Sequence, residues 1–266
     1  MSITAPQPAV DVRRADDRFA TDISWLDSKH SFSFGPHYRA DNTHFGLLLV
    51  NNDDRVLPGT GFETHPHRDM EIVTWVLQGS LVHQDSEGHS GVLYPGLAQR
   101  MSAGTGIRHS ERNDSWRVGG GPAHDEPVHF VQMWVPPDEP GIQPGYEQLE
   151  IDDVLLRGSL VPVASGMERH DGVSAIRIKN RYAALHAARL DPGDRVELPD
   201  APFTHVFVAR GGVDLEGVGR LDEGDAARIT AQLGPSGPRS GGHGGRAVTA
   251  DEPAEILVWE MHATIG

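Results

Sequence analysis

The stretch THPHRDMEIVTWVLQG, Thr64–Gly79, contains a pair of histidines, then a glutamate, an apolar run and a glycine. His65 and His67 stand two positions apart, so in an extended chain their side chains point the same way, roughly 7 Å apart. Pro66 has no backbone N–H group, which favours the start or the edge of a strand. The stretch therefore predicts either half of a metal site or a sheet edge that carries two histidines, and Glu71 is a further candidate ligand.

The same spacing recurs further along the chain, where His109 and Glu111 flank a serine. Two such pairs on adjacent strands can supply three imidazole nitrogens and one carboxylate oxygen. This donor set suits Fe, Mn, Co, Ni, Cu or Zn rather than Ca or Mg. A single His-x-His is a weak signal, but ten of the fifteen histidines lie between His30 and His129, in the half that holds both pairs. We therefore predict a transition-metal site in the first half.

Short apolar runs between turn residues predict an all-β fold. The chain contains 31 glycines and 19 prolines, which implies many turns, and no apolar helical period exceeds about three turns. Clusters of turn residues are predicted at 51–54 and 58–61, and residues 1–20 are expected to be loosely held. The predicted strands are 31–34, 45–50, 71–77, 80–84, 91–94, 97–101 and 128–135, followed by 183–190, 195–198, 205–209, 212–216, 226–230 and 255–260.

The two halves of the chain repeat one pattern. VLQGSL leads to GVLYPGLAQRMSA in the first half, and VARGGV leads to GRLDEGDAARITA in the second. The repeat predicts one β-sandwich or barrel template used twice. The offset is 132 residues from Gly79 to Gly211 and 128 from Gly96 to Gly224. These offsets carry His65, His67 and His109 to positions without histidine: Glu197, Pro199 and Gly237.

A run of prolines and glycines at 136–145 marks the predicted boundary. We expect residues 1–137 to form an N-terminal domain with the metal site and residues 138–266 to form a domain without metal ligands. The Gly/Pro/Ser-rich segment 234–245 is expected to be a mobile loop.

The overall charge argues against several classes of partner. The net charge is −15 and the pI is near 5.3, so the phosphate backbone of a nucleic acid would repel the protein. Cysteine is absent, which excludes disulfides and thiolate chemistry and fits the cytosol. No secretory signal or membrane-spanning run is visible. We expect a soluble, cytoplasmic protein without direct nucleic-acid or membrane partners.

Longer motifs resemble a known family. GTGFETHPHRDMEIVTWVLQGSLVHQDS and GVLYPGLAQRMSAGTGIRHSE resemble the pirin family, a bicupin branch of the cupin superfamily. DSKHSFSFG, VNNDDRVLPGTGF, EPVHFVQMWVPP and GIQPGYEQ resemble the bacterial quercetinase-type pirins. The resemblance is close over about residues 20–150 and looser beyond. It implies two tandem cupin domains, each a jelly-roll β-barrel, with metal in the N-terminal one only.

The resemblance also implies a ligand set. By the pirin pattern, one divalent transition metal is held by His65, His67, His109 and Glu111. Fe(II) is the first expectation, with Ni, Co, Mn, Cu or Zn as alternatives. In the commoner cupin pattern Glu71 would ligate instead of Glu111. The pirin pattern and the same-face relation of His109 and Glu111 favour Glu111, which leaves Glu71 as a carboxylate bonded to a neighbouring donor.

The implied activity is that of a quercetin 2,3-dioxygenase-like oxidoreductase. A flavonol would bind the metal as an anion through its adjacent enol and ketone oxygens, because the metal lowers the pKa of the hydroxyl. Glu111 would accept that proton as the catalytic base if its carboxylate is loosely held. The enolate would react with O2, and the ring would open with loss of carbon monoxide. An alternative is a metal-dependent redox-sensing or regulatory protein that binds a protein partner, since some pirins are described as transcriptional cofactors.

The other candidates carry less chemistry. His30, His37 and His44 are expected to be exposed loop histidines, with a group that supports the metal ligands as the alternative. His83 and His89 flank a turn and are expected to be solvated. Core positions are expected for Trp75, Met101 and Trp134. His129 and Gln132 are candidates either for the cavity wall or for the core.

Overall fold

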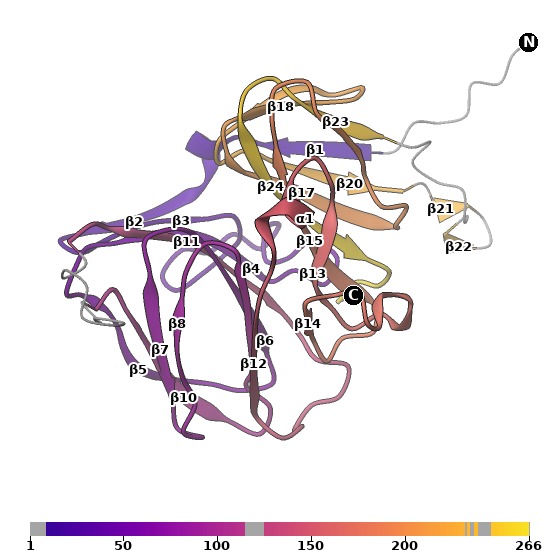
Figure 1. Ribbon diagram of the computed structural model, residues 1–266. Helices are drawn as coiled ribbons and strands as arrows, with labels where there is room; N and C mark the ends of the chain where they lie inside the picture. Colours follow the sequence, from indigo (N-terminus) through magenta and orange to yellow (C-terminus); the bar gives the residue numbers. More distant parts are fainter. Residues whose placement is uncertain (1–8, 115–124, 232, 235–236, 239–245, 266) are drawn as a thin grey trace, which may run out of the picture.

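The computed structural model describes residues 9–114, 125–231, 233–234, 237–238 and 246–265, and it confirms the all-β class. The described residues contain one short α-helix, α1 (Asp153–Leu156), and two 3-10 turns, Ala15–Asp17 and Glu168–His170. Two β-barrels lie side by side, one built largely from each half of the chain (Figure 1). None of the described helices has the length and apolar character needed to cross a membrane.

The first barrel is a sandwich of a seven-stranded and a four-stranded sheet. The larger sheet has the order β12-β9-β6-β11-β4-β3-β2, and the smaller one has the order β5-β10-β7-β8. The strands of the larger sheet are β2 (Phe19–Ile23), β3 (Leu26–His30), β4 (Val50–Val56), β6 (Glu71–Gln78), β9 (Leu97–Ser102), β11 (Val128–Val135) and β12 (Gly145–Glu150). Those of the smaller sheet are β5 (Gly61–His67), β7 (Leu81–Asp85), β8 (Ser90–Leu93) and β10 (Ile107–Arg112).

The second barrel repeats this arrangement. Its sheets have the orders β1-β20-β17-β24-β15-β13-β14 and β16-β23-β18-β19, beside a short pair, β21 (Leu233–Gly234) and β22 (Gly237–Pro238). The pair β6–β11 of the first barrel corresponds to the pair β17–β24 of the second, and both pairs have the same register. Gln132 faces Thr74 in the first barrel, and Val258 faces Val206, the residue 132 positions after Thr74, in the second. The remaining strands are β1 (Ala9–Arg13), β13 (Val161–Ser165), β14 (Ile176–Arg177), β15 (Ala183–Leu190), β16 (Arg195–Glu197), β17 (Phe203–Arg210), β18 (Gly212–Leu215), β19 (Gly219–Asp222), β20 (Ala226–Thr230), β23 (Ala247–Ala250) and β24 (Ala254–Met261).

The two halves exchange their edge strands. β1, from the start of the chain, pairs with β20 of the second barrel, and in Figure 1 it lies in indigo among the orange and yellow strands. β12, which follows the proline-rich segment, pairs with β9 of the first barrel. The expectation that residues 1–20 are loosely held is therefore wrong for residues 9–20, because the edge of a sheet offers them hydrogen bonds. Residues 1–8 lie outside the described part. The division at 137/138 stays a prediction.

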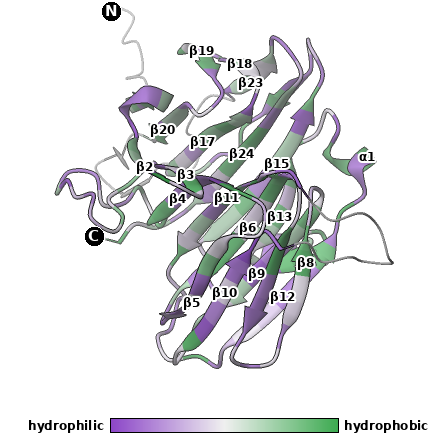
Figure 2. Cartoon of the chain, turned by 90° about the vertical axis from the view of Figure 1, so that its left-hand side faces the viewer, coloured by the Kyte–Doolittle hydropathy of each residue, from purple (hydrophilic) through white to green (hydrophobic). Residues whose placement is uncertain are grey.

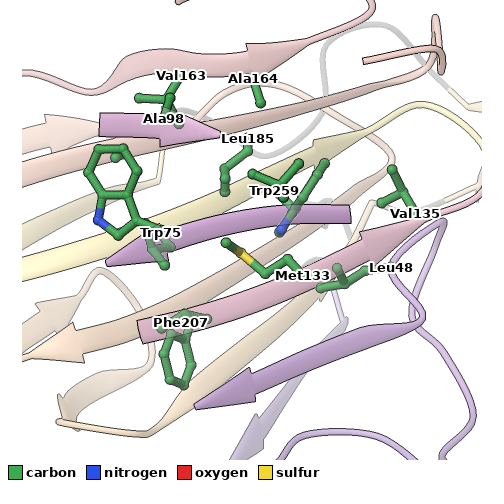
Figure 3. Packing of buried hydrophobic residues seen from close by; sticks show 14 of the residues in the cluster. Leu48, Trp75, Ala98, Met133, Val135, Val163, Ala164, Leu185, Phe207 and Trp259 are labelled. Atoms are coloured by element: carbon green, nitrogen blue, oxygen red, sulfur yellow. The ribbon is translucent and has the colours of Figure 1, made fainter. Parts of the chain in front are cut away.

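The large sheets of the two barrels share one apolar core. Trp75, Met133, Phe207 and Trp259 meet there (Figure 3) and are nearly or fully buried. Trp75 also donates a hydrogen bond of 2.7 Å from Nε1 to Glu255 on β24. β6 thus packs against the second barrel on one face and fills its own barrel with the other. Burial on both faces explains why its apolar run is continuous rather than alternating.

Two local predictions about the first barrel are wrong. Segments 31–34 and 45–50 contain isolated bridges, and β3 and β4 begin or end beside them. The predicted turn at 51–54 instead lies inside β4, which is hydrogen-bonded between β3 and β11. Turn propensity gives way here because the polar side chains of β4 find partners on both sides of the sheet. The predicted mobile loop at 234–245 lies mostly outside the described residues.

Candidate metal centre

Three of the predicted ligands meet on the small sheet of the first barrel. β5 pairs with β10 so that His65 faces His109 and His67 faces Ile107. Ring centroids are 4.5 Å apart for His65 and His109, and 4.8 Å apart for His67 and each of the other two. β10 is hydrophilic along most of its length (Figure 2). The strand register therefore brings together histidines that are more than forty positions apart in the sequence.

The nitrogens of these rings are prepared for an ion. His67 Nε2 and His109 Nε2 are buried without a hydrogen-bond partner. His65 donates from Nδ1 to the carbonyl oxygen of Glu63 at 2.7 Å, which leaves its Nε2 as the lone-pair atom. An unsatisfied buried polar atom costs about 1–3 kcal/mol, so two such atoms in one cluster need an explanation. Three imidazole lone pairs within reach of one point fit a divalent transition metal.

Burial keeps the imidazoles in the form that binds metal. Desolvation, followed by the neighbouring histidines, lowers the pKa of His67 to about 4 and that of His109 to about 3. Both rings are therefore neutral at pH 7. Neutral imidazole is the ligand form, so no proton has to leave these two rings when a metal binds at neutral pH.

Glu111 lies beside this cluster and is firmly held. A β-bulge separates it from His109, and its Oε2 lies 4.0 Å from His109 Nε2. Gln132 on β11 donates from Nε2 to both carboxylate oxygens at 2.8 Å, and Trp134 donates from Nε1 to Gln132 Oε1 at 3.0 Å. Glu111 also lines the same cavity as His65. The carboxylate is thus oriented by a chain of two hydrogen-bonded side chains.

Glu71 lies elsewhere. It is the first residue of β6, fully buried, and its Oε2 accepts a hydrogen bond of 2.9 Å from the backbone nitrogen of Lys179. Burial raises its pKa. It belongs to neither histidine cluster of the first barrel and does not line the cavity, within the described part of the chain. Its contact joins the first barrel to the second.

His83 is a member of the site that the sequence reading missed. It was expected to be solvated, but it is 1% exposed on β7. Its Nδ1 lies 3.5 Å from His109 Nδ1 and its Nε2 lies 3.3 Å from Asp85, while the ring packs on Tyr146 with centroids 4.9 Å apart. His83, His109 and Glu111 form a second group of possible ligands. The i, i+2 spacing of His83 and Asp85 is the sequence signal that could have found it.

A cavity of about 750 Å³ opens beside the histidines. Its size is that of a small-molecule site, and its walls are largely apolar. Aromatic walls are provided by Trp25, Phe34, Phe62 and Trp134, and polar groups by Thr21, Ser28, His30, Asn52, Asp54, Glu63, His65, His67, Glu111, Arg112 and Gln132.

Several predicted positions change accordingly. His30 was expected to be exposed, but it is buried on β3, lines the cavity and contacts Asn52 at 2.9 Å. Trp134 was expected in the core and also lines the cavity. Of the two residues considered for the wall, Gln132 lies there, whereas His129 is buried against Asp53 at 2.6 Å.

Within the described residues, the second barrel contains no equivalent of the triple-histidine cluster. Where His65 faces His109, Glu197 faces Ala247, so the counterpart of His109 is Ala247 and not Gly237. The offset of 128 fails at this point because additional residues stand between β20 and β23. One other group of ligand types, His170, His186 and Glu260, occurs in the described part of this barrel. There the carboxylate is bound by Arg169, by His186 at 3.0 Å and by His262 at 2.7 Å.

Two cupin barrels in one chain make the protein a bicupin, and the histidine cluster lies in the first barrel. Comparison with known proteins agrees: the Pirin family model matches residues 12–135, and the chain belongs to the pirin family. A Mycobacterium tuberculosis protein named "Putative quercetin 2,3-dioxygenase" is 59% identical over 257 residues, 97% of each chain. The Escherichia coli protein named quercetin 2,3-dioxygenase is 47% identical over 143 residues, 54% of this chain and 58% of that protein.

A solved structure extends the likeness to three dimensions. The bacterial pirin YhhW from Escherichia coli, in complex with nickel(II), has a TM-score of 0.80 and 32% sequence identity. The match covers 96% of this chain and 100% of that one. Both barrels are therefore shared with that protein.

Proposed function

We propose that the protein is a metal-dependent dioxygenase that opens the ring of flavonols, with quercetin and O2 as substrates. The observation that carries the proposal is a set of three imidazoles with unshared nitrogens, two of which, His65 and His67, line an aromatic cavity of about 750 Å³. The names of the Mycobacterium tuberculosis and Escherichia coli relatives support the same chemistry.

His65, His67, His109 and Glu111 would hold the ion. When bound, the metal would supply Lewis acidity, which lowers the pKa of a flavonol hydroxyl and favours its anion. Fe(II) is the first candidate, and the nickel(II) complex of YhhW supports Ni(II) as a second. The donor set accommodates either ion.

Glu111 would accept the proton of the flavonol 3-hydroxyl on a carboxylate oxygen. General-base transfer requires the carboxylate to be within hydrogen-bond reach of the hydroxyl, and Gln132 fixes its orientation. Because Gln132 is itself held by Trp134, the carboxylate needs little rearrangement during the proton transfer. Glu111 therefore has the role of catalytic base in this proposal.

The aromatic walls would hold the flat rings of the substrate. Trp25, Phe34, Phe62 and Trp134 line the cavity, and contact with aromatic side chains favours planar aromatic ligands. A filled apolar cavity also excludes water, which protects a reactive flavonol anion from side reactions. One O2 is consumed and one carbon monoxide leaves for each ring that opens.

The test is simultaneous measurement of O2 uptake and carbon monoxide release with quercetin, using Fe(II)-loaded and Ni(II)-loaded protein. His109→Ala is expected to abolish both signals, since it removes one ligand. His44→Ala is the matched control, because His44 lies outside both histidine groups of the first barrel and does not line the cavity. Loaded wild-type protein that turns over no flavonol, or a His109→Ala variant that behaves like wild type, would contradict the proposal.

A further inference from the structure

The cavity wall contains a second buried polar atom that has no partner. Among the described residues that line the cavity, two carry such an atom: His67, through Nε2, and Asp54, through Oδ1. The proposed metal would satisfy His67. The carboxyl of Asp54 is not among the proposed metal ligands, and the residue is only 3% exposed. Other unpartnered atoms of this barrel, such as Thr74 Oγ1, lie away from the cavity, so the position of Asp54 in the cavity wall is what makes its oxygen a candidate partner for a ligand.

Asp54 lies where the polar and apolar parts of the barrel meet. On β4 it faces Ser28 of β3 on one side and Phe130 of β11 on the other. Alternation along β4 places Asn52 and Val56 on the same face as Asp54. Val56 belongs to an apolar cluster that also contains Phe130, whereas Asn52 lines the cavity. The carboxyl is therefore a polar group beside an apolar floor.

The carboxyl is available as a hydrogen-bond donor. Burial raises the pKa of Asp54 to about 8, a bond from Ser28 opposes the rise, and the charges of Asp53 and Glu111 add to it. At neutral pH the group therefore retains its proton, so it can donate one hydrogen bond as well as accept others. A neutral, buried carboxyl of this kind matches a phenolic hydroxyl, which also donates and accepts.

We propose that Asp54 selects and positions the substrate, by hydrogen bonding to a ring hydroxyl other than the one that reacts. The proposal rests on the proposed function, since it takes a flavonol as the occupant of the cavity. The aromatic walls contact ring faces that all flavonols share, so they discriminate little between flavonols. A directed bond to one hydroxyl discriminates strongly, because a ligand without that hydroxyl leaves the buried carboxyl unpaired.

The experiment compares two ligands and three variants. Quercetin carries hydroxyls on both ring systems, whereas 3-hydroxyflavone carries only the reacting one. Dissociation constants are measured by fluorescence titration of Ni(II)-loaded protein kept free of O2. The variants are Asp54→Ala, Asp54→Asn and the control Thr74→Val, which removes another buried, unpartnered oxygen of this barrel outside the cavity wall.

We expect wild-type protein to bind quercetin more tightly than 3-hydroxyflavone. Asp54→Ala should weaken quercetin binding about 10- to 100-fold, the effect of one buried hydrogen bond, and change 3-hydroxyflavone binding less than about threefold. Asp54→Asn retains a donor and an acceptor and should keep most of the preference. Thr74→Val should change neither dissociation constant.

Two results would overturn the assignment of Asp54 while leaving the proposed function intact. One is equal weakening of both ligands by Asp54→Ala, which is the result of a general packing defect. The other is an unchanged affinity for quercetin. If the loaded wild-type protein binds neither flavonol and turns over none, the proposed function and the role of Asp54 both fall.

Discussion

Gln132 offers the sharpest test of how the carboxylate of Glu111 is used. Its amide donates to both oxygens of Glu111 at 2.8 Å, and both residues are less than a tenth exposed. Gln132→Met keeps the length of the side chain and removes the amide. The carboxylate then loses both of these donors in a place that water reaches poorly.

The expected size follows from these contacts. Hydrogen bonds to a charged group contribute about 1.5–3 kcal/mol, and two bonds from one amide share geometry, so we expect about that total rather than twice it. In a rate this corresponds to a decrease of about 10- to 100-fold in kcat/KM. The loss should appear mainly in kcat, because Gln132 orients the base rather than the rings of the substrate.

The assay is steady-state O2 uptake with quercetin at matched metal content, together with thermal unfolding. Gln99→Met is the matched control: Gln99 is also buried in the same barrel, on β9, and does not line the cavity. If both variants lose the same activity, the effect is one of packing. A kcat/KM of Gln132→Met within about twofold of wild type would refute the reasoning, since it would correspond to less than about 0.5 kcal/mol.

Three further predictions concern stability and metal affinity. Asp54→Asn should raise the free energy of unfolding in urea, and the increase should be larger at pH 8 than at pH 5. The pKa of Asp54 in the folded protein is raised to about 8, so the wild-type protein loses stability as the pH rises above the ordinary value of 3.8, by up to about 1.4 kcal/mol per pH unit; equal effects of the substitution at both pH values would contradict this. His83→Phe should weaken metal binding about tenfold in chelator competition, because His109 Nδ1 loses its partner. His89→Ala is the control and should leave metal binding unchanged, because His89 contacts Asp85 but not His109. Trp75→Phe should lower the free energy of unfolding by about 1–3 kcal/mol in urea, since a buried carboxylate of β24 loses a donor, and an unchanged midpoint would count against that bond.

The strands with strong apolar runs could be predicted from the sequence. Three predicted strands, 128–135, 183–190 and 226–230, match β11, β15 and β20. Each is five to eight residues long and mostly apolar, and that signal is local to the chain. The polar strand β4 could not be predicted in this way. Its residues 51–54 resemble a turn until β3 and β11 lie on either side of them.

The exchange of edge strands was also outside the reach of local pattern. β1 and β20 are separated by more than two hundred residues, and the composition of neither strand predicts that it pairs with the other. Their pairing places β1 at one edge of the large sheet of the second barrel, and this edge exists only once that sheet has formed. The same holds for Glu71, whose partner, the backbone of Lys179, belongs to the second barrel.

The sequence by itself determined the all-β class, the duplication and the spacing of His65, His67 and His109, because side-chain direction in a strand depends only on position along it. The tertiary structure decided which of these side chains meet. It set His65 opposite His109, buried His83 behind them, and turned Asp54 from a turn residue into part of the cavity wall. The physical reason is that the register of a strand, its burial and the hydrogen bonding of its side chains depend on the neighbouring strands and not on its own sequence.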